Sequence, residues 1–366
     1  MKRLVRAFAL AWVVASVAAC ASVGGGANVP AVPGPNQGRP DEIWPIKVRE
    51  HVDLWLHGFA LLQEDSSFVP FFKRSYGTEM TVLKNRANVV TQLDANRDRL
   101  RARLTANPQL VNAQFVPLNF ASWDQLAQAV DLFIRANGDP RAASSQQQAA
   151  AIAFFAAYFQ TGPDRDWLRL FVQSLTDESN RFYHSYWLQQ QRERANILEL
   201  ADTLWQRTYR PRMQRFLNNT QQPQGEILLS LPLDGEGRTQ TAGSRSNIMA
   251  VAFPDRPNDA ADAFYVIAHE AVGQLAATAV TDNITPEQRR TGLGDRYQSA
   301  AAVRAGALLI QRISPENLDA YMRYYLRSVN RPAGSNVQTA FLAAFVIPDT
   351  IRDALIRQLE LVLGGI

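Results

Sequence analysis

Residues 263–280 read "AFYVIAHEAVGQLAATAV" and decide how the second half of the chain folds. The stretch is almost entirely apolar, and its pattern predicts one strong helix over Asp259–Val280 that packs into a core. Two ionisable residues, His269 and Glu270, stand at its centre. Their place in an apolar helix raises the question of whether the pair carries chemistry.

A His-Glu pair on a helix is the first half of the HExxH pattern. In that pattern two histidines four residues apart lie on one helix face and bind one zinc ion, and the glutamate acts on a metal-bound water. The second histidine would stand at position 273, but the residue there is Gly273, which has no side chain. The pattern therefore lacks one ligand.

The segment 225–325 nevertheless resembles the zincin metallopeptidases. It contains a strand pattern, a turn and a helix reading "FYVIAHEAVGQLA", with apolar residues ahead of the His-Glu pair. The resemblance implies His269 as the first metal ligand, Glu270 as the catalytic base and zinc as the cofactor. It implies no counterpart for the second ligand.

The third ligand is also missing from its usual place. In the gluzincin branch a glutamate on a following helix completes the zinc site. Here the next predicted helix has no aspartate or glutamate between Arg296 and Ile313. Asp295 and Glu316, on either side of that segment, are the possible substitutes, and a catalytic zinc needs three protein ligands.

The chain has four histidines, so few residues are available to repair the site. Asp53 and His57 share one helix face at a spacing of four residues and would supply ligands if they met His269 in space; a solvated helix face is the alternative. His184, within "RFYHSYW", is predicted to be a packed and hydrogen-bonded side chain.

A reading without metal is also open for the stretch at 263–280. Gly273, Ala276, Ala277 and Val280 would form a ridge of small residues that lets another helix approach closely, with the His-Glu pair held by local partners. Other catalytic patterns are weaker. The loops "LDGEGRT" and "RTGLGDR" do not match a phosphate-binding fingerprint, and the chain has no GxSxG pattern.

The N-terminus predicts export. Lys2, Arg3 and Arg6 precede an apolar run from Ala7 to Ala19 that is too short to span a bilayer and has the layout of a secretory signal. The following residues, Val17-Ala18-Ala19-Cys20, resemble the bacterial lipoprotein box. The resemblance implies cleavage before Cys20, lipidation of that residue and, because Ala21 follows it, anchoring in the outer membrane.

Cys20 is the only cysteine of the 366 residues, so no intramolecular disulfide is possible. The chain has 38 Lys and Arg against 34 Asp and Glu, and removal of the signal with its three cations leaves 35 against 34. The mature charge is thus close to +1, and no basic run with interleaved aromatic residues indicates nucleic-acid binding. The membrane, through Cys20, and an unidentified protein or peptide are the expected partners.

The composition divides the chain into four regions. Residues 1–19 are the signal peptide, and residues 20–40 are the lipidated cysteine with a tether rich in glycine and proline. Residues 41–220 are predicted to be helical. Residues 221–366 combine two strand-like runs, Ile227–Leu233 and Asn247–Phe253, with helices that carry the His-Glu pair, and we expect this region to be continuous with the helical one.

The expected fold is therefore mainly α with a small antiparallel sheet, in the α+β class. Because two ligand positions are missing, the expected function is that of an envelope lipoprotein whose zincin-like domain binds or scaffolds without catalysis, with no cofactor. A zinc hydrolase with an unusual ligand set using His269 and Glu270 is the first alternative. A purely structural helical lipoprotein is the second.

The lipid anchor gives the first prediction. Several acyl chains on Cys20 should hold the protein on the membrane, so Cys20→Ser should move it to the soluble fraction of fractionated cells. Globomycin, which blocks the lipoprotein signal peptidase, should leave the wild-type chain at its unprocessed size. Retention of Cys20→Ser in the washed outer membrane would contradict the anchor.

Overall fold

The structure is a computed structural model, and it describes residues 43–63, 67–241 and 246–364. The predicted signal peptide, Cys20 and the tether lie outside the described residues. Within the described part the chain is mainly helical with one small sheet, as predicted for the α+β class.

The sheet has the order β1 (Ile46–Lys47), β2 (Gln224–Ser230), β4 (Ser246–Ala252) and β3 (Arg238–Thr241). Strands β1, β2 and β4 run parallel, and only the edge strand β3 is antiparallel to its neighbour. The expectation of an antiparallel sheet was therefore wrong. The two strand-like runs predicted from the sequence correspond to β2 and β4. The connection between them contains β3.

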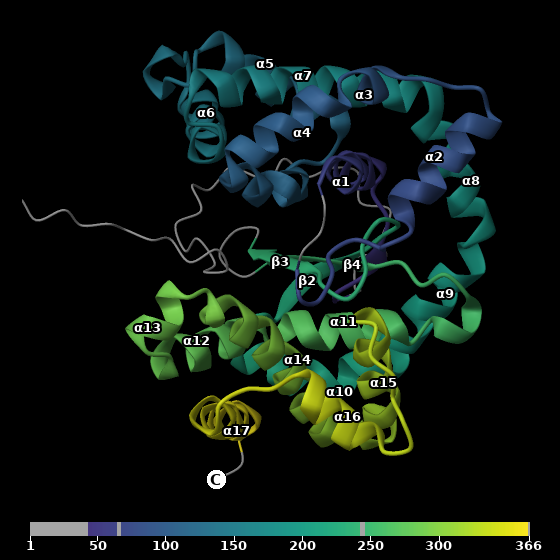
Figure 1. Cartoon of the computed structure of the whole chain (residues 1–366), viewed down its shortest axis with the longest axis vertical. Coiled ribbons are helices and arrows are strands. Elements are labelled where there is room, and N and C mark those ends of the chain that lie inside the picture. Colours follow the sequence, from purple (N-terminus) through teal and green to yellow (C-terminus); the bar gives the residue numbers. More distant parts are fainter. Residues whose placement is uncertain (1–42, 64–66, 242–245, 365–366) are drawn as a thin grey trace, which may run out of the picture.

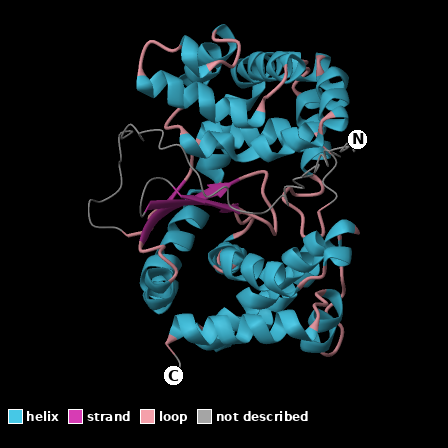
Figure 2. Cartoon of the chain, turned by 90° about the vertical axis from the view of Figure 1, so that its left-hand side faces the viewer, coloured by secondary structure: helices cyan, strands magenta, loops and turns pink. Residues whose placement is uncertain are grey.

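Figures 1 and 2 show the sheet between two groups of helices, with α1–α7 on one face and α10–α17 on the other. Helices α8 and α9 run along one side and connect the two groups. The helices are α1 (Glu50–Leu62), α2 (Tyr76–Arg86), α3 (Gln92–Ala95), α4 (Arg97–Ala106), α5 (Trp123–Arg135), α6 (Gln146–Tyr158), α7 (Gly162–Glu178), α8 (His184–Glu193), α9 (Ala195–Leu204), α10 (Arg210–Asn219), α11 (Asp262–Ala271), α12 (Gly273–Asn283), α13 (Pro286–Arg290), α14 (Leu293–Ile313), α15 (Leu318–Ser328), α16 (Val337–Ala344) and α17 (Asp349–Leu363).

The core of the first group forms around α1. Trp55 and Phe59 are fully buried and pack against Phe171 of α7, with ring centroids 5.0 and 5.3 Å apart. A Cβ atom at Gly58 would lie 2.7 Å from the Phe171 ring, so glycine is what lets the two helices approach this closely. The helix continues through Gly58 because this packing compensates for its weak helix propensity.

A buried ionic network joins α1, α2 and α7. Glu178 is fully buried and accepts hydrogen bonds from Lys84 (2.8 and 3.0 Å), His57 (3.1 Å) and Thr91. Burial by itself raises the pKa of Glu178, but His57 and Lys84 outweigh it and lower the pKa to about 2. His57 is therefore buried and hydrogen-bonded to Glu178, and it does not lie on a solvated helix face.

Asp53, the predicted partner of His57, is also buried, and it joins α1 to the sheet. Its carboxylate accepts hydrogen bonds from Ser230 (2.6 Å), Trp187 (2.9 Å) and the backbone of Leu231 (3.3 Å). Burial raises the pKa of Asp53 to about 7, although these hydrogen bonds lower it. Glu178 thus links three helices of the first group, and Asp53 links α1 to β2.

The helix predicted over Asp259–Val280 is broken. It consists of α11 and α12, which meet at Val272, and the segments Pro257–Ala271 and Gly273–Asn283 are bent by 42°. Among the described helices, no single one is long and apolar enough to cross a bilayer, and this bent pair passes that test only when taken together.

The buried network gives the second prediction. Lys84→Met keeps the length of the side chain but leaves the Glu178 carboxylate with less compensation in the core. We expect a loss of about 3–5 kcal/mol in the free energy of unfolding by urea. Arg135→Met is the control, because it removes an exposed pair with Asp131 that should contribute under about 1 kcal/mol. Equal losses in the two variants would show that the network does not stabilise the fold.

Candidate functional site

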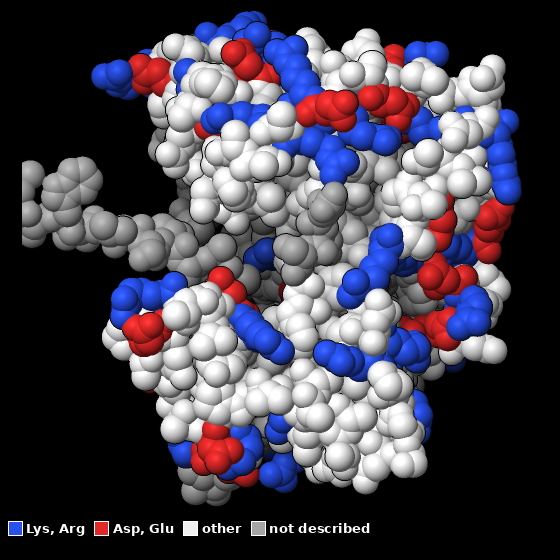
Figure 3. All heavy atoms as spheres, viewed as in Figure 1, with Lys and Arg blue, Asp and Glu red and all other residues white. Residues whose placement is uncertain are grey.

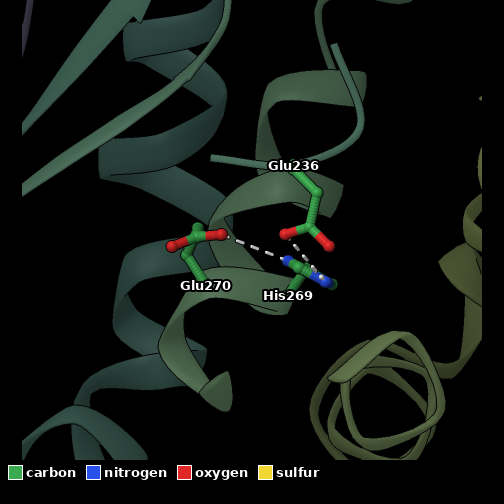
Figure 4. A group of neighbouring side chains, drawn as sticks. All are labelled: Glu236, His269 and Glu270. Carbon is green, nitrogen blue, oxygen red and sulfur yellow. Dashed lines mark hydrogen bonds and ion pairs between the residues drawn. The ribbon is translucent and has the colours of Figure 1, made fainter. Parts of the chain in front are cut away.

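Glu236, His269 and Glu270 form a compact cluster between the sheet and the second helical group (Figure 4). Their candidate ligand atoms all lie within 4.8 Å of one another. His269 and Glu270 come from the last turn of α11, and Glu236 comes from the loop between β2 and β3. Among the described residues, no other three acidic, histidine or cysteine side chains converge in this way.

The two carboxylates approach different nitrogens of the imidazole. Nδ1 of His269 is 3.3 Å from Oε1 of Glu270, and Nε2 is 3.8 Å from Oε2 of Glu236. The ring is 2% exposed, and its Nε2 has no hydrogen-bond partner among the described residues. Figure 4 shows the three side chains together, with dashed lines from the ring to both acids.

Glu270 is held by the edge strand. Its Oε1 accepts a hydrogen bond from the backbone N–H of Gly237 (3.1 Å), and its Oε2 accepts one from the hydroxyl of Thr239 (3.3 Å). A Cβ atom at Gly237 would lie 3.0 Å from Cγ of Glu270 and would clash with the carbonyl of Ala250. Glycine at position 237 therefore lets the start of β3 pack against α11.

Residues from α14 and α15 hold the other two members. Ser299 donates a hydrogen bond to Oε1 of Glu236 (2.9 Å). The Tyr325 ring stacks on His269, with centroids 5.4 Å apart, and its hydroxyl donates to the carbonyl of Gly235 (3.2 Å). Tyr325 thus fixes both the ring and the loop that supplies Glu236.

The charges around His269 favour its protonated form. Burial alone lowers the pKa of His269, but the negative charge of Glu236 and the hydrogen bond and charge of Glu270 outweigh burial and raise the pKa above 6.5. Burial also raises the pKa of Glu236, although His269 opposes that shift. Both shifts favour a proton bound within this buried cluster, where it compensates the charge of the carboxylates.

The geometry fits a metal ion only in part. Two ligands about 2.1 Å from a tetrahedral ion lie roughly 3.4 Å apart, so Nε2 of His269 and Glu236 at 3.8 Å are close to a ligand pair. Glu270 faces Nδ1 and not Nε2, but its candidate ligand atom also lies within 4.8 Å of those of His269 and Glu236. The three residues equal the number of protein ligands that a catalytic zinc ion requires, but the two carboxylates approach different ring nitrogens.

The structure shows what surrounds position 273, where the second histidine ligand would stand. Gly273 lies just past the bend between α11 and α12, and a Cβ atom there would meet nothing within 4 Å. The small residue at a close helix approach is instead Gly306 of α14, whose Cβ would lie 3.4 Å from Cα of His269. The predicted ridge is therefore right for the buried Ala276 and Val280 and wrong for Gly273.

The other candidate ligands do not reach the cluster. Glu316 is exposed and pairs with Arg212 and Ser314, and Asp295 is exposed at the start of α14. The hydrogen bonds of Asp53 and His57 go to the first helical group and β2. His184 is hydrogen-bonded to Glu50 (2.8 Å) as predicted, but it is exposed and not packed.

Glu236 is the site residue that the sequence did not reveal. It lies in "LDGEGRT", which was considered only as a phosphate-binding loop. The two glycines that flank Glu236 were a signal in the sequence, because residues without side chains let a loop approach a helix closely. The sequence could not show which helix the loop approaches.

Comparisons with protein-family models, with curated proteins and with solved structures found no match to this chain.

The third prediction concerns the charge of His269. Its pKa is higher in the folded than in the unfolded chain, so the folded state binds the proton more tightly. The resulting stabilisation is complete below about pH 6.5 and is lost as the pH rises through the folded-state pKa. The difference in unfolding free energy between wild type and His269→Gln should therefore shrink between pH 6 and pH 9.

Urea unfolding at several pH values measures this difference. His184→Gln is the control, because that imidazole is exposed and its removal should change the unfolding free energy by under about 0.5 kcal/mol at each pH. A stabilisation by His269 that grows with rising pH would mean that the ring is neutral in the folded protein.

Proposed function

We propose that the chain is an outer-membrane lipoprotein whose zincin-like domain binds an extended polypeptide segment without cleaving it. The observation that carries the proposal is the position of β3. It is an antiparallel edge strand of an otherwise parallel sheet, and it packs on the helix that carries His269 and Glu270. A helical protein with a purely structural role would not require an edge strand beside His269 and Glu270.

A sheet edge with free backbone groups is suited to binding polypeptide, and β3 is half-buried, with Thr241 exposed at its end. An extended segment that adds to such an edge gains backbone hydrogen bonds along its length, and nearby pockets select its side chains. Strand β4 is the only described strand that pairs with β3. Figure 3 shows a hollow between the two helical groups on this face, rimmed in part by Lys and Arg side chains.

Three features support loss of catalysis. Glu270, the residue that would act on water, is occupied by hydrogen bonds to β3 and His269. The helix bends next to the position where the second histidine ligand would stand, and α14 presents Gly306 to His269 and has no carboxylate between Arg296 and Ile313. Glu236 and Glu270 raise the pKa of His269, and a proton on that ring would neutralise charge in the role that a metal ion has in an active zincin.

A zinc-dependent hydrolase remains the second candidate because of one observation. The unpartnered Nε2 of His269 faces the Glu236 carboxylate at nearly the separation of two zinc ligands. In that case His269 and Glu236 would hold the ion, which would polarise a scissile carbonyl, and Glu270 would act as the base.

The fourth prediction separates the two functions. Protein lacking residues 1–20 is incubated with reduced and carboxymethylated α-lactalbumin, which stays unfolded, and amide hydrogen exchange is measured by mass spectrometry. Binding should slow exchange at Arg238–Thr241 while the α-lactalbumin stays intact. Exchange at Ile46–Lys47, on the opposite edge of the sheet, is the internal control and should not change.

Two results would contradict the proposal. Unchanged exchange at Arg238–Thr241 with saturating α-lactalbumin would show that the strand edge does not bind polypeptide. Fragments of α-lactalbumin, together with one tightly bound zinc ion per chain that is lost in His269→Ala and Glu236→Ala, would establish the hydrolase instead.

A further inference from the structure

Arg238, the first residue of β3, is a half-buried cation without a charged partner. Every other buried or half-buried Lys or Arg in the described part of the chain takes part in a hydrogen bond or an ion pair, and Arg238 takes part in none with a described residue. Burial raises the pKa of Glu236 and the charge of Arg238 opposes that shift, but no ion pair joins the two side chains. Because a cation that has lost part of its water is stabilised by an anion, Arg238 is available to an anionic group of a bound molecule.

Two aromatic rings hold the guanidinium of Arg238. Its Cζ atom lies 5.1 Å from the centroid of the Phe115 ring and 5.7 Å from that of the Phe71 ring. These contacts attract the cation to the rings without using its N–H groups as hydrogen-bond donors to an oxygen. The guanidinium is thus held in place with its donors free, and two of them can bind both oxygens of one carboxylate.

The direction of the Arg238 side chain follows from the alternation along β3. Thr239 donates a hydrogen bond to Glu270 and therefore faces α11. Arg238 and Gln240 lie on the other face of the strand, where Gln240 accepts a hydrogen bond from Asn119 (3.0 Å). A strand added beside β3 places every second side chain next to this face. Alternate residues of a bound segment would therefore come close to Arg238.

A second arginine without an ion pair lies near the start of β3. Arg296 of α14 is exposed, and its Cζ atom lies 5.5 Å from the centroid of the Phe68 ring. It has no ion pair or hydrogen bond with a described residue. Ser299, one turn further along α14, donates a hydrogen bond to Glu236 in the loop that leads into β3. Arg296 therefore adds a second free cation on this side of the strand.

We propose that the polypeptide segment that adds to β3 is acidic, and that Arg238 binds the carboxylate of an aspartate or glutamate side chain in it. Arg296 binds a second carboxylate of the same segment. Two arginines call for two carboxylates, and the end of a chain supplies only one, so side chains are the expected source. This inference rests on the proposed binding of polypeptide at β3.

Two forms of one unfolded protein test the proposal. Reduced and carboxamidomethylated α-lactalbumin is used with its carboxylates free, and again after carbodiimide and ammonia have converted them to amides. Fluorescence anisotropy of the labelled α-lactalbumin measures its affinity for protein lacking residues 1–20. The wild type should bind the form with free carboxylates at least about tenfold more tightly than the amidated form.

The variants locate the effect. Arg238→Gln should weaken binding of the free form by about tenfold and leave binding of the amidated form unchanged, because only the free form has an anion for Arg238 to bind. Arg296→Gln should have the same selectivity with a loss of about threefold, since this arginine is exposed. Arg357→Gln is the control, because it removes an exposed arginine on α17 and should bind both forms like wild type.

A random copolymer of glutamate and tyrosine with an amidated carboxyl end separates the two sources of carboxylate. It has side-chain carboxylates alone, so it should bind to the wild type and about tenfold more weakly to Arg238→Gln. Binding of free α-lactalbumin without binding of this copolymer would mean that the chain end is recognised, and it would contradict the proposal.

Other results would also overturn the proposal. Equal binding of both α-lactalbumin forms by the wild type, with slower amide exchange at Arg238–Thr241 in each, would leave polypeptide binding at β3 standing and remove the preference for acidic segments. An equal loss for both forms in Arg238→Gln would show that the arginine only supports the fold. Preferential binding of the free form that depends on Arg238, without slower exchange at Arg238–Thr241, would instead contradict the added strand.

Discussion

The contact of the buried imidazole of His269 with the carboxylates of Glu236 and Glu270 is the interaction on which the second half of the structure depends. Each acid comes from a different element, and each is held by a further one: Glu270 by the start of β3, and Glu236 by α14. A buried carboxylate without a compensating charge is costly. The two carboxylates raise the pKa of His269, and a proton on its ring would compensate their charge where the loop, the start of β3 and the helices meet.

This constraint explains the glycines and the bend around the cluster. Gly237 allows β3 to reach Glu270, and Gly306 allows α14 to pass beside the backbone of His269. The bend after α11 directs α12 away along α14 and α17. A zinc site of the HExxH kind would need a second histidine at position 273, where Gly273 stands just past the bend.

The sequence predicted the parts of this fold that follow from local pattern. Apolar periodicity located the helices, and two β-like runs located β2 and β4. It did not predict β3, because "RTQT" has no buried face and its pairing depends on β4. Glu236 was missed for the same reason, since a loop residue joins a site only through the path of the chain. The burial of His57 and Asp53 was missed because their partners, Glu178 and Ser230, are far away in sequence.

The state of the His269 ring is the central claim, and nitrogen NMR of the imidazole tests it most directly. With ¹⁵N-labelled histidine, and His269→Gln to assign the signal, the account predicts a titration midpoint above 6.5, with protons on both ring nitrogens below that midpoint. A ring at pH 6.5 that has mainly one unprotonated nitrogen, or a nitrogen shift that responds to equimolar zinc, would contradict the account.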